Sequence, residues 1–445
     1  MIQTWRKTSS ELIYSPNVIK DIHMKTIDGY DVKIFTDNIE DTAIEQIRQL
    51  LSIDVFSDCK IRIMPDVHAG AGCVIGFTGN LGDKVIPNIV GVDIGCGMLV
   101  QPFICNNPID FHALNEYILR AIPSGRDFRD ENYLPLSQKY SDIYQNAKQL
   151  ILQLRCYREL KEVRRLYKSI GSLGSGNHFI ELDKDESDLY YLVVHTGSRN
   201  LGKQVADIYQ KLAVKCQSGW GKLMVEKNRI IEEYKQAGRK SELQDVIRNL
   251  HNSFKTCKLT IPQDLCYLQG QFREDYLHDM HICQCWAQIN RKLIVNLIMD
   301  FIVGKGLASS EEHFQPFESV HNYIGNDNII RKGAISARLG EKCIIPLNMR
   351  DGSLICIGKG NEDWNFSAPH GAGRIMSRSQ AFKEISLEDF KKSMEDVYSE
   401  TVTEYTKDES PMVYKSKREI MNNIKGTVDI ETVIKPVFNF KAADI

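Results

Sequence analysis

The residue types that bind metal ions best stand in short glycine-rich or strand-like segments that lie far apart in this chain. The candidate ligands are Asp93, Cys96, His178, His195 and His321. The first two share the glycine-rich segment 91–98, while His178 follows a second glycine-rich segment and His195 ends the apolar run 190–195. One such histidine alone is more often a satisfied polar group, but strand ends and loops are where sites are built. Together the five residues predict a metal site, and a fold that gathers these distant segments.

A further segment suggests phosphate chemistry. Residues 368–378 read Ala-Pro-His-Gly-Ala-Gly-Arg-Ile-Met-Ser-Arg, so that His370 lies in a bend of small residues that two arginines follow. Small residues let the backbone approach a bulky anion closely, and arginine side chains match phosphate oxygens. His370 could act there as a nucleophile toward phosphorus, or as an acid or base beside it. A turn with a structural histidine is the alternative.

Hydrophobic periodicity and turn residues predict both strands and helices. Strands are expected at 31–35, 62–103, 188–195 and 315–357, and helices at 41–51, 107–122, 137–168, 262–304 (one or two helices) and 386–424. The charged segment 201–254 has a helical period and a break near 218–221, which predicts an antiparallel helical hairpin outside the site, inserted at about 201–258. This pattern is typical of an α+β, or mixed α/β, fold with central β-sheets surrounded by helices.

Cysteine usage and hydropathy indicate the compartment. Twelve cysteines without regular spacing, and without a Cys-x-x-Cys pair, indicate reduced thiols and argue against a structural zinc module. Residues 1–7 lack the apolar stretch of a signal peptide. The longest apolar run, residues 293–304, is interrupted by Asn296 and Asp300 and is too short to span a bilayer. We therefore expect a cytoplasmic protein without a membrane partner.

Several blocks of the chain occur in the order that is typical of one family. They are residues 64–70 (Met-Pro-Asp-Val-His-Ala-Gly), 91–98, 171–181, 190–199, 319–322, 368–378 and 438–441 (Phe-Asn-Phe-Lys). With them the chain resembles the RtcB family of RNA-splicing ligases over nearly its whole length. A length of 445 residues alone would suggest two or three domains. A site assembled from all these blocks instead predicts one RtcB-like catalytic domain over residues 1–445.

The resemblance implies an enzyme that uses GTP and Mn²⁺ to join an RNA 3′-phosphate or 2′,3′-cyclic phosphate end to a 5′-hydroxyl end, in tRNA splicing or RNA repair. His370 would attack the α-phosphate of GTP and form a His–GMP intermediate. The GMP would pass to the RNA to give an activated RNA-3′pp5′G end, and the 5′-hydroxyl would then expel GMP. The identity of the RNA, the oligomeric state and the need for an activating partner of the archease type stay open.

The resemblance also implies two manganese ions that share Cys96 as a bridging ligand. Asp93 and His178 would complete the shell of one ion, and His195 and His321 the shell of the other. By ligand softness alone, a cysteine with histidines points to zinc, because manganese favours oxygen ligands. We follow the family for the metal and keep this objection in view.

The nucleotide contacts are implied in the same way. They are Asn177, His178, Phe179, Ile180, Glu181, His321, Asn322, Pro346, Leu347, Asn348, Met349, Ser353, His370, Gly371, Ala372, Gly373 and Lys441. Arg199 and Arg374 would contact RNA phosphates. Residues 346–349 read Pro-Leu-Asn-Met where many family members have Pro-Gly-Ser-Met, and 361–367 also differs from the commoner version. We expect GTP use to be retained, with altered kinetics or substrate choice.

Asp66 lies in the block 64–70 and by analogy lies near the loop that carries Asp93. Its carboxylate could orient or deprotonate the attacking 5′-hydroxyl, or hold a metal ligand in place. An aspartate that only stabilises a turn is the alternative.

A net charge of −2 does not indicate a general nucleic-acid binder, so an RNA partner would be held by a local patch. The best candidate is the basic run 155–168, with Arg158, Lys161, Arg164, Arg165 and Lys168. Its alternative is a solvated helix face.

Two other function classes fit parts of the pattern. A metal-dependent phosphoesterase that opens cyclic phosphates would need the metal ligands but neither His370 nor Lys441. A catalytically dead RNA-binding module would be expected to have lost ligands, and none is missing from this sequence.

Overall fold

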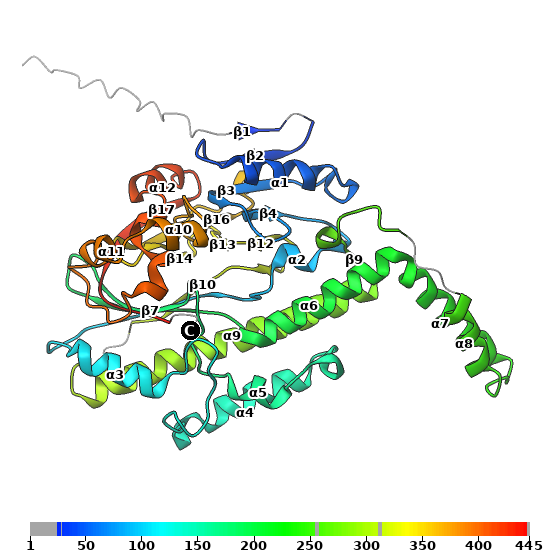
Figure 1. Cartoon of the computed structure of the whole chain (residues 1–445), viewed down its shortest axis with the longest axis horizontal. Helices are drawn as coiled ribbons and strands as arrows, with labels where there is room; N and C mark the ends of the chain where they lie inside the picture. The colour runs from blue at the N-terminus through cyan, green and yellow to red at the C-terminus, as the bar shows by residue number, and fades with distance from the viewer. Residues whose placement is uncertain (1–24, 28, 254–257, 310–313, 443–445) are drawn as a thin grey trace, which may run out of the picture.

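A computed structural model describes residues 25–442, apart from residue 28 and the segments 254–257 and 310–313. Two β-sheets form the centre of the molecule and helices pack around them (Figure 1), which confirms the predicted mixed α+β fold class. Residues 1–7, for which the sequence predicts no signal peptide, lie outside the described residues.

The larger sheet has seven antiparallel strands. Their order is β10 (Phe317–Val320), β6 (Gly97–Phe103), β8 (Tyr190–Thr196), β7 (Phe179–Lys184), β17 (Val428–Lys441), β15 (Gly352–Gly358) and β14 (Lys342–Asn348). Val320 pairs with Gly97, Gly97 with Thr196, and His195 with Phe179. Antiparallel neighbours run in opposite directions. The C-terminal ends of β10 and β8 and the N-terminal ends of β6 and β7 therefore lie side by side at one end of this sheet.

The smaller sheet has six strands. Their order is β1 (Lys25–Thr26), β2 (Val32–Ile34), β3 (Ile61–His68), β4 (Ile75–Gly79), β12 (Ile330–Lys332) and β11 (Tyr323–Ile324). The pairing of β3 with β4 shifts register between Ile63 and His68, so the end of β3 leaves the regular ladder. Two ribbons, β13 (Ala334–Ser336) with β16 (Ser367–Pro369) and β5 (Lys84–Val85) with β9 (Leu268–Gln269), complete the strands.

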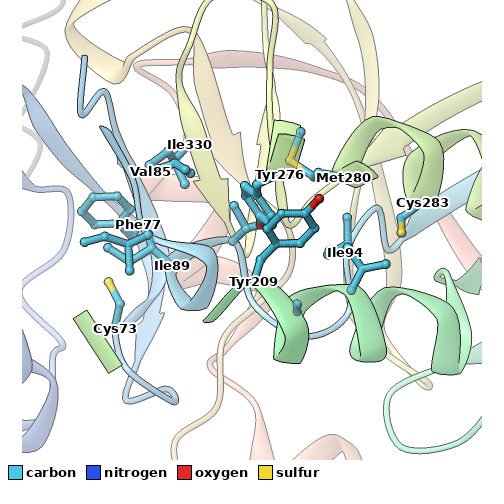
Figure 2. Packing of buried hydrophobic residues seen from close by; sticks show 14 of the residues in the cluster. Cys73, Phe77, Val85, Ile89, Ile94, Tyr209, Tyr276, Met280, Cys283 and Ile330 are labelled. Carbon is cyan, nitrogen blue, oxygen red and sulfur yellow. The ribbon is translucent and has the colours of Figure 1, made fainter. Parts of the chain in front are cut away.

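A single helix, α9 (Gln271–Gly304), spans the molecule beside α6 (Arg199–Lys215) (Figure 1). Tyr209 of α6 packs on Tyr276 of α9 with ring centroids 5.3 Å apart (Figure 2). Burial of such large side chains contributes about 2 kcal/mol each to stability. Among the residues described, no helix combines the length and the apolar character needed to cross a membrane.

The remaining helices agree with most sequence-based expectations. They are α1 (Asp41–Leu51), α2 (Pro87–Val90), α3 (Phe111–Ala121), α4 (Ser141–Leu152), α5 (Val163–Lys168), α10 (Arg378–Glu384), α11 (Leu387–Ser393) and α12 (Lys417–Asn423). The expectation of helix throughout 386–424 is wrong, because short 3₁₀ turns and extended chain lie between α11 and α12. Strand β17 was not predicted, although residues 428–431 alternate apolar and polar side chains as a strand does.

A helical arm extends away from the two sheets (Figure 1). After α6 the chain kinks at Gly219, with φ of 96°, and continues into α7 (Gly221–Gln236). It reverses direction only before α8 (Leu243–Ser253), which packs against α7. The turn that the sequence suggested near 218–221 is therefore a kink, and the reversal lies about one helix later. Only Leu223 of α7 is buried, and no residue of α8 is.

Candidate active site

The five predicted metal ligands converge at the end of the larger sheet where the termini of β10, β6, β8 and β7 lie side by side. The Sγ atom of Cys96 lies 3.3 Å from the Nε2 atoms of both His178 and His195. The Nε2 atom of His178 lies 3.1 Å from a carboxylate oxygen of Asp93, and that of His195 lies 3.5 Å from the Nε2 atom of His321.

These atoms form two groups that share the thiol of Cys96. Asp93 and His178 complete one group, and His195 and His321 complete the other, with the ligand atoms of each group within 4.8 Å of one another. Nδ1 of His195 bonds the carbonyl oxygen of Asn177 at 3.0 Å, which leaves Nε2 free to bind a metal. These donors could therefore hold two metal ions, with Cys96 common to both groups.

Burial and neighbouring charges set the protonation states of these ligands. Burial, followed by the charges of the other histidines, lowers the pKa of His195 well below its usual value, so this ring is neutral and able to bind a metal. Burial, reinforced by the charge of Asp93, raises the pKa of the Cys96 thiol well above its usual value. Desolvation alone would raise the pKa of Asp93, but the hydrogen bond and charge of His178 hold it at about 2. Metal binding would therefore displace a proton from Cys96.

Two buried side chains of α9 hold the segments that carry the ligands. Nη1 of Arg291 donates to the carbonyl oxygens of Gly95, at 2.8 Å, and of Thr196, at 2.7 Å. The side-chain oxygen of Asn290 accepts from the backbone N–H of Gly171 at 2.6 Å. The long helix thereby ties together the loop before Cys96, the end of β8 and the glycine-rich loop before His178.

His370 follows β16 and lies beside the metal ligands. Its ring centroid is 4.7 Å from that of His321. Its Nδ1 atom bonds a carboxylate oxygen of Asp66 at 2.7 Å, and its backbone N–H donates to the same oxygen at 3.2 Å. Asp66 is fully buried at the irregular end of β3. When Nδ1 carries the ring proton and donates it to this carboxylate, the free lone pair of the ring lies on Nε2.

The bend after His370 packs directly on Asp66. Gly373 has φ of 76°, and a Cβ atom at this residue would lie 2.4 Å from the backbone oxygen of Asp66. Only glycine allows both this conformation and this approach. The small residues seen in the sequence thus fix the nucleophile candidate against its carboxylate partner.

A pocket opens between His370 and the strands β7 and β17. Of the predicted nucleotide contacts, it is lined by Asn177, Phe179, Glu181, Pro346, Leu347, Asn348, Met349, His370, Gly371, Ala372, Gly373 and Lys441. The predicted phosphate contact Arg374 lines it as well. Glu181 accepts a hydrogen bond from Asn439 at 2.7 Å. Burial raises the pKa of Glu181 to about 7, although Asn439 and Lys441 oppose this shift.

One buried carboxylate gathers the cations of this pocket. Glu409 accepts from Arg378 at 2.7 Å and from Arg374 at 3.4 Å through one oxygen, and its other oxygen binds Lys441 at 2.6 Å and the hydroxyl of Tyr414 at 2.7 Å. Desolvation would raise the pKa of Glu409, but the charges of Lys441 and Arg378 hold it at about 2. Glu409 therefore stays ionised and keeps three cationic side chains at the pocket.

Other predicted residues lie outside the pocket lining. The side chain of Ile180 packs in a hydrophobic cluster rather than in the pocket, and Ser353 is buried in β15 with its hydroxyl unpartnered. Asn322 bonds the backbone of Asp93 and of Gly333. His178 and His321 contribute to the ligand cluster rather than to the pocket wall.

Arg199, which was predicted to contact an RNA phosphate, forms hydrogen bonds with other segments of the protein. It donates to Ser172 at 3.3 Å and to the carbonyl oxygen of Gly125 at 3.0 Å. Its charge also helps to lower the pKa of Asp93.

Comparison with known proteins shows to which family this chain belongs. The model of the family "tRNA-splicing ligase RtcB" matches residues 46–442. The chain belongs to the RtcB family. It is 29% identical over 402 residues to the RNA-splicing ligase RtcB of Escherichia coli (strain K12), with 85% of this chain and 88% of that protein covered. The tRNA-splicing ligase RtcB of Methanococcus maripaludis is 25% identical over 459 residues, with 86% and 87% covered.

Several pocket residues of this RtcB family member were not predicted. They are His68, Glu409, Tyr414 and Asn439, whereas Arg378, which also lines the pocket, is one of the two arginines that the sequence singled out. Asn439 stands two residues before Lys441, so a strand would have placed both on one face. Glu409 and Tyr414 gave no such signal, because they fall in a segment that was expected to be helical.

Removal of the shared thiol tests the metal site. We expect Cys96→Ala to lower Mn²⁺ affinity at least about 100-fold, because neither ligand group is complete without Cys96. Metal content after gel filtration measures this loss. Cys105→Ala, which removes a half-buried thiol outside the site, is the matched control. Unchanged Mn²⁺ content in Cys96→Ala would rule out the bridging role.

Proposed function

We propose that the protein is a GTP- and Mn²⁺-dependent RNA ligase that joins a 3′-phosphate or 2′,3′-cyclic phosphate end to a 5′-hydroxyl end, in a reducing, cytoplasmic compartment. The observation that carries the proposal is the setting of His370. Its Nδ1 is bound by a buried carboxylate 2.7 Å away, and its ring lies 4.7 Å from a candidate metal ligand. An imidazole held in this way can present Nε2 as a nucleophile to phosphorus.

In the first step, Nε2 of His370 attacks the α-phosphorus of GTP. A P–N bond forms and pyrophosphate leaves with the electrons of the broken P–O bond. Lys441, Arg374 and Arg378, which Glu409 holds at the pocket, offer positive charge to the phosphates. The ionised carboxylate of Glu181 can accept hydrogen bonds from the N1–H and amino groups of guanine, which favours GTP over ATP.

In the second step, an oxygen of the RNA 3′-phosphate attacks the phosphoramidate, and the P–N bond breaks to give RNA-3′pp5′G. The 5′-hydroxyl of the other RNA then attacks the 3′-phosphorus and GMP leaves. Imidazole suits this sequence because it is both a nucleophile and a good leaving group. A 2′,3′-cyclic phosphate would first be opened by water.

Asp93, Cys96 and His178 would hold one metal ion, and Cys96, His195 and His321 the other. When bound, such ions neutralise charge on the phosphoryl group that is transferred. Ligand softness still favours zinc over manganese. Adduct formation measured with each metal in turn decides between them.

A metal-dependent phosphoesterase is the competing function. It would use the ligand cluster but would have no need for the pair of His370 and Asp66. The two functions are separated by incubation with labelled GTP and Mn²⁺. A ligase forms an acid-labile, alkali-stable protein–GMP adduct and seals RNA, whereas a phosphoesterase forms no adduct.

The variant His370→Ala separates formation of the GMP adduct from the sealing step. We expect this variant to lose the GMP adduct and all joining of 3′-phosphate ends, yet to bind Mn²⁺, because other residues hold the metals. It should still join RNA supplied with a preformed 3′pp5′G end, since sealing needs no new P–N bond. An adduct that persists in His370→Ala would mean that another residue is the nucleophile.

Asp66→Asn tests how the nucleophile is positioned. From the sequence, Asp66 could act on the 5′-hydroxyl, hold a metal ligand in place or only stabilise a turn. Its hydrogen bonds to His370 support a positioning role in adduct formation. A neutral amide accepts the Nδ1–H bond more weakly, and its NH₂ group can instead donate to Nδ1 and leave the proton on Nε2. We therefore expect the rate of adduct formation to fall about 10²- to 10⁴-fold. Asp66→Glu should restore part of it. A normal adduct rate with slow sealing would instead support the 5′-hydroxyl role.

The raised pKa of Glu181 predicts how GTP use depends on pH. Burial raises the pKa of Glu181, whereas the hydrogen bond from Asn439 and the charge of Lys441 oppose this shift. Only the ionised carboxylate accepts both guanine donors, so the KM for GTP should rise as pH falls below about 7. We expect Glu181→Gln to have a high KM that does not change over this range. A wild-type KM that is flat between pH 6 and 8 would contradict the role of Glu181.

A further inference from the structure

A strip of exposed cationic side chains lies beside the glycine-rich loop of the site. This cationic strip consists of Arg126, Arg158, Lys161, Arg164, Arg165 and Lys168, of which only Lys168 is half-buried. The last three belong to α5, and Arg126 belongs to the loop that precedes α4. Five of these residues belong to the basic run 155–168, for which a solvated helix face is the alternative.

Most cationic side chains of the strip form no ion pair with another described residue. Arg165 is 3.5 Å from Glu162. Within the described part of the chain, Arg126, Lys161, Arg164 and Lys168 form no ion pair with a carboxylate. An ordinary solvated helix face pairs many of its charges, as the arm does, where Arg229 binds Glu226 and Glu233. Of the six cationic side chains of the strip, only Arg165 forms an ion pair with a described residue, although the exposed carboxylates of Asp127, Glu159 and Glu162 stand next to strip residues in the sequence.

An aromatic side chain lies between the charges. The guanidinium of Arg165 lies 5.1 Å from the ring centroid of Phe128, and the ammonium of Lys168 lies 5.8 Å from the same centroid. Phe128 is half-buried, so part of its ring stays accessible. Cationic groups that follow a phosphate backbone, together with an aromatic ring for base stacking, are the features of single-stranded nucleic-acid binding.

Two hydrogen bonds connect the strip to the pocket. Arg165 donates to the carbonyl oxygen of Arg126 at 3.2 Å, and the N–H of Gly125 donates to the carbonyl oxygen of Gly174 at 3.0 Å. Gly174 belongs to the loop that ends at Asn177, which lines the pocket. The strip therefore begins one loop away from the site where the RNA end would react.

We propose that the cationic strip binds the single-stranded RNA that leads to the reacting end, with its arginines and lysines on the phosphates and Phe128 against a base. This inference rests on the proposed ligase function and adds the surface that holds the substrate. Because the strip contacts backbone rather than base edges, it should bind RNA with little dependence on sequence.

A charge-reversal variant tests the strip without touching the site. In Lys161→Glu/Arg164→Glu we expect a KM for RNA about tenfold higher, and a slope of log affinity against log salt that is shallower by about 1.4, since about 0.7 is lost per phosphate contact. The rate of GMP adduct formation, which needs no RNA, should not change. Lys222→Glu/Lys240→Glu, on the arm, changes the charge equally at exposed residues and should leave both quantities unchanged.

The outcomes are separable. An unchanged KM for RNA and an unchanged salt slope in Lys161→Glu/Arg164→Glu would overturn the assignment of the strip. An equal loss in the arm variant would show a general effect of net charge and would overturn it too. If the wild-type protein forms no GMP adduct, the proposed function itself fails. Phe128→Ala provides a second measurement, and a loss of RNA affinity at unchanged adduct rate supports the strip.

Discussion

Backbone pairing among four antiparallel strands holds the candidate metal ligands together. Adjacent strand ends lie about 5 Å apart in a sheet, so Cys96 before β6, His178 before β7, His195 near the end of β8 and His321 after β10 must converge once the register is set. The register of β8 in turn depends on its two apolar faces, because Tyr190, Leu192 and Val194 pack in one hydrophobic cluster and Tyr191 and Val193 in another. A one-residue slip of β8 would turn His195 to the opposite face of the sheet. The core and the site are therefore specified by the same pairing.

Buried carboxylates then position what the sheet brings together. Asp66 fixes the ring of His370, and Glu409 holds Arg374, Arg378 and Lys441 at the pocket. A buried charge is tolerated only when it is paired, so each of these groups depends on its partners. This dependence links segments from β3 to the last strand, and it explains why a site of this kind needs nearly the whole chain.

The sequence predicted the parts of the site that carry local signals. Glycines beside His178 and His370, and the apolar run before His195, mark loops and strand ends, and the structure brings these residues together. The mixed fold class was also predictable from periodicity, as was helix over 262–304, where one or two helices were expected and the structure has the single helix α9. Glu409 was not predictable, because no signal near it in the sequence indicates that this residue, at the end of a short 3₁₀ helix, meets Lys441 of strand β17. The partner of Asp66 was missed for the same reason: its contact with His370 is made across 304 residues.

The central claim is that His370 carries the nucleotide. The most direct test is to incubate the wild-type protein with GTP labelled at the α-phosphate and Mn²⁺, digest the adduct at alkaline pH and locate GMP by mass spectrometry. The account predicts GMP on the peptide that contains residues 368–374, attached through Nε2 of His370. GMP on a different residue, or a stable protein that binds two metal ions but never acquires GMP, would contradict it.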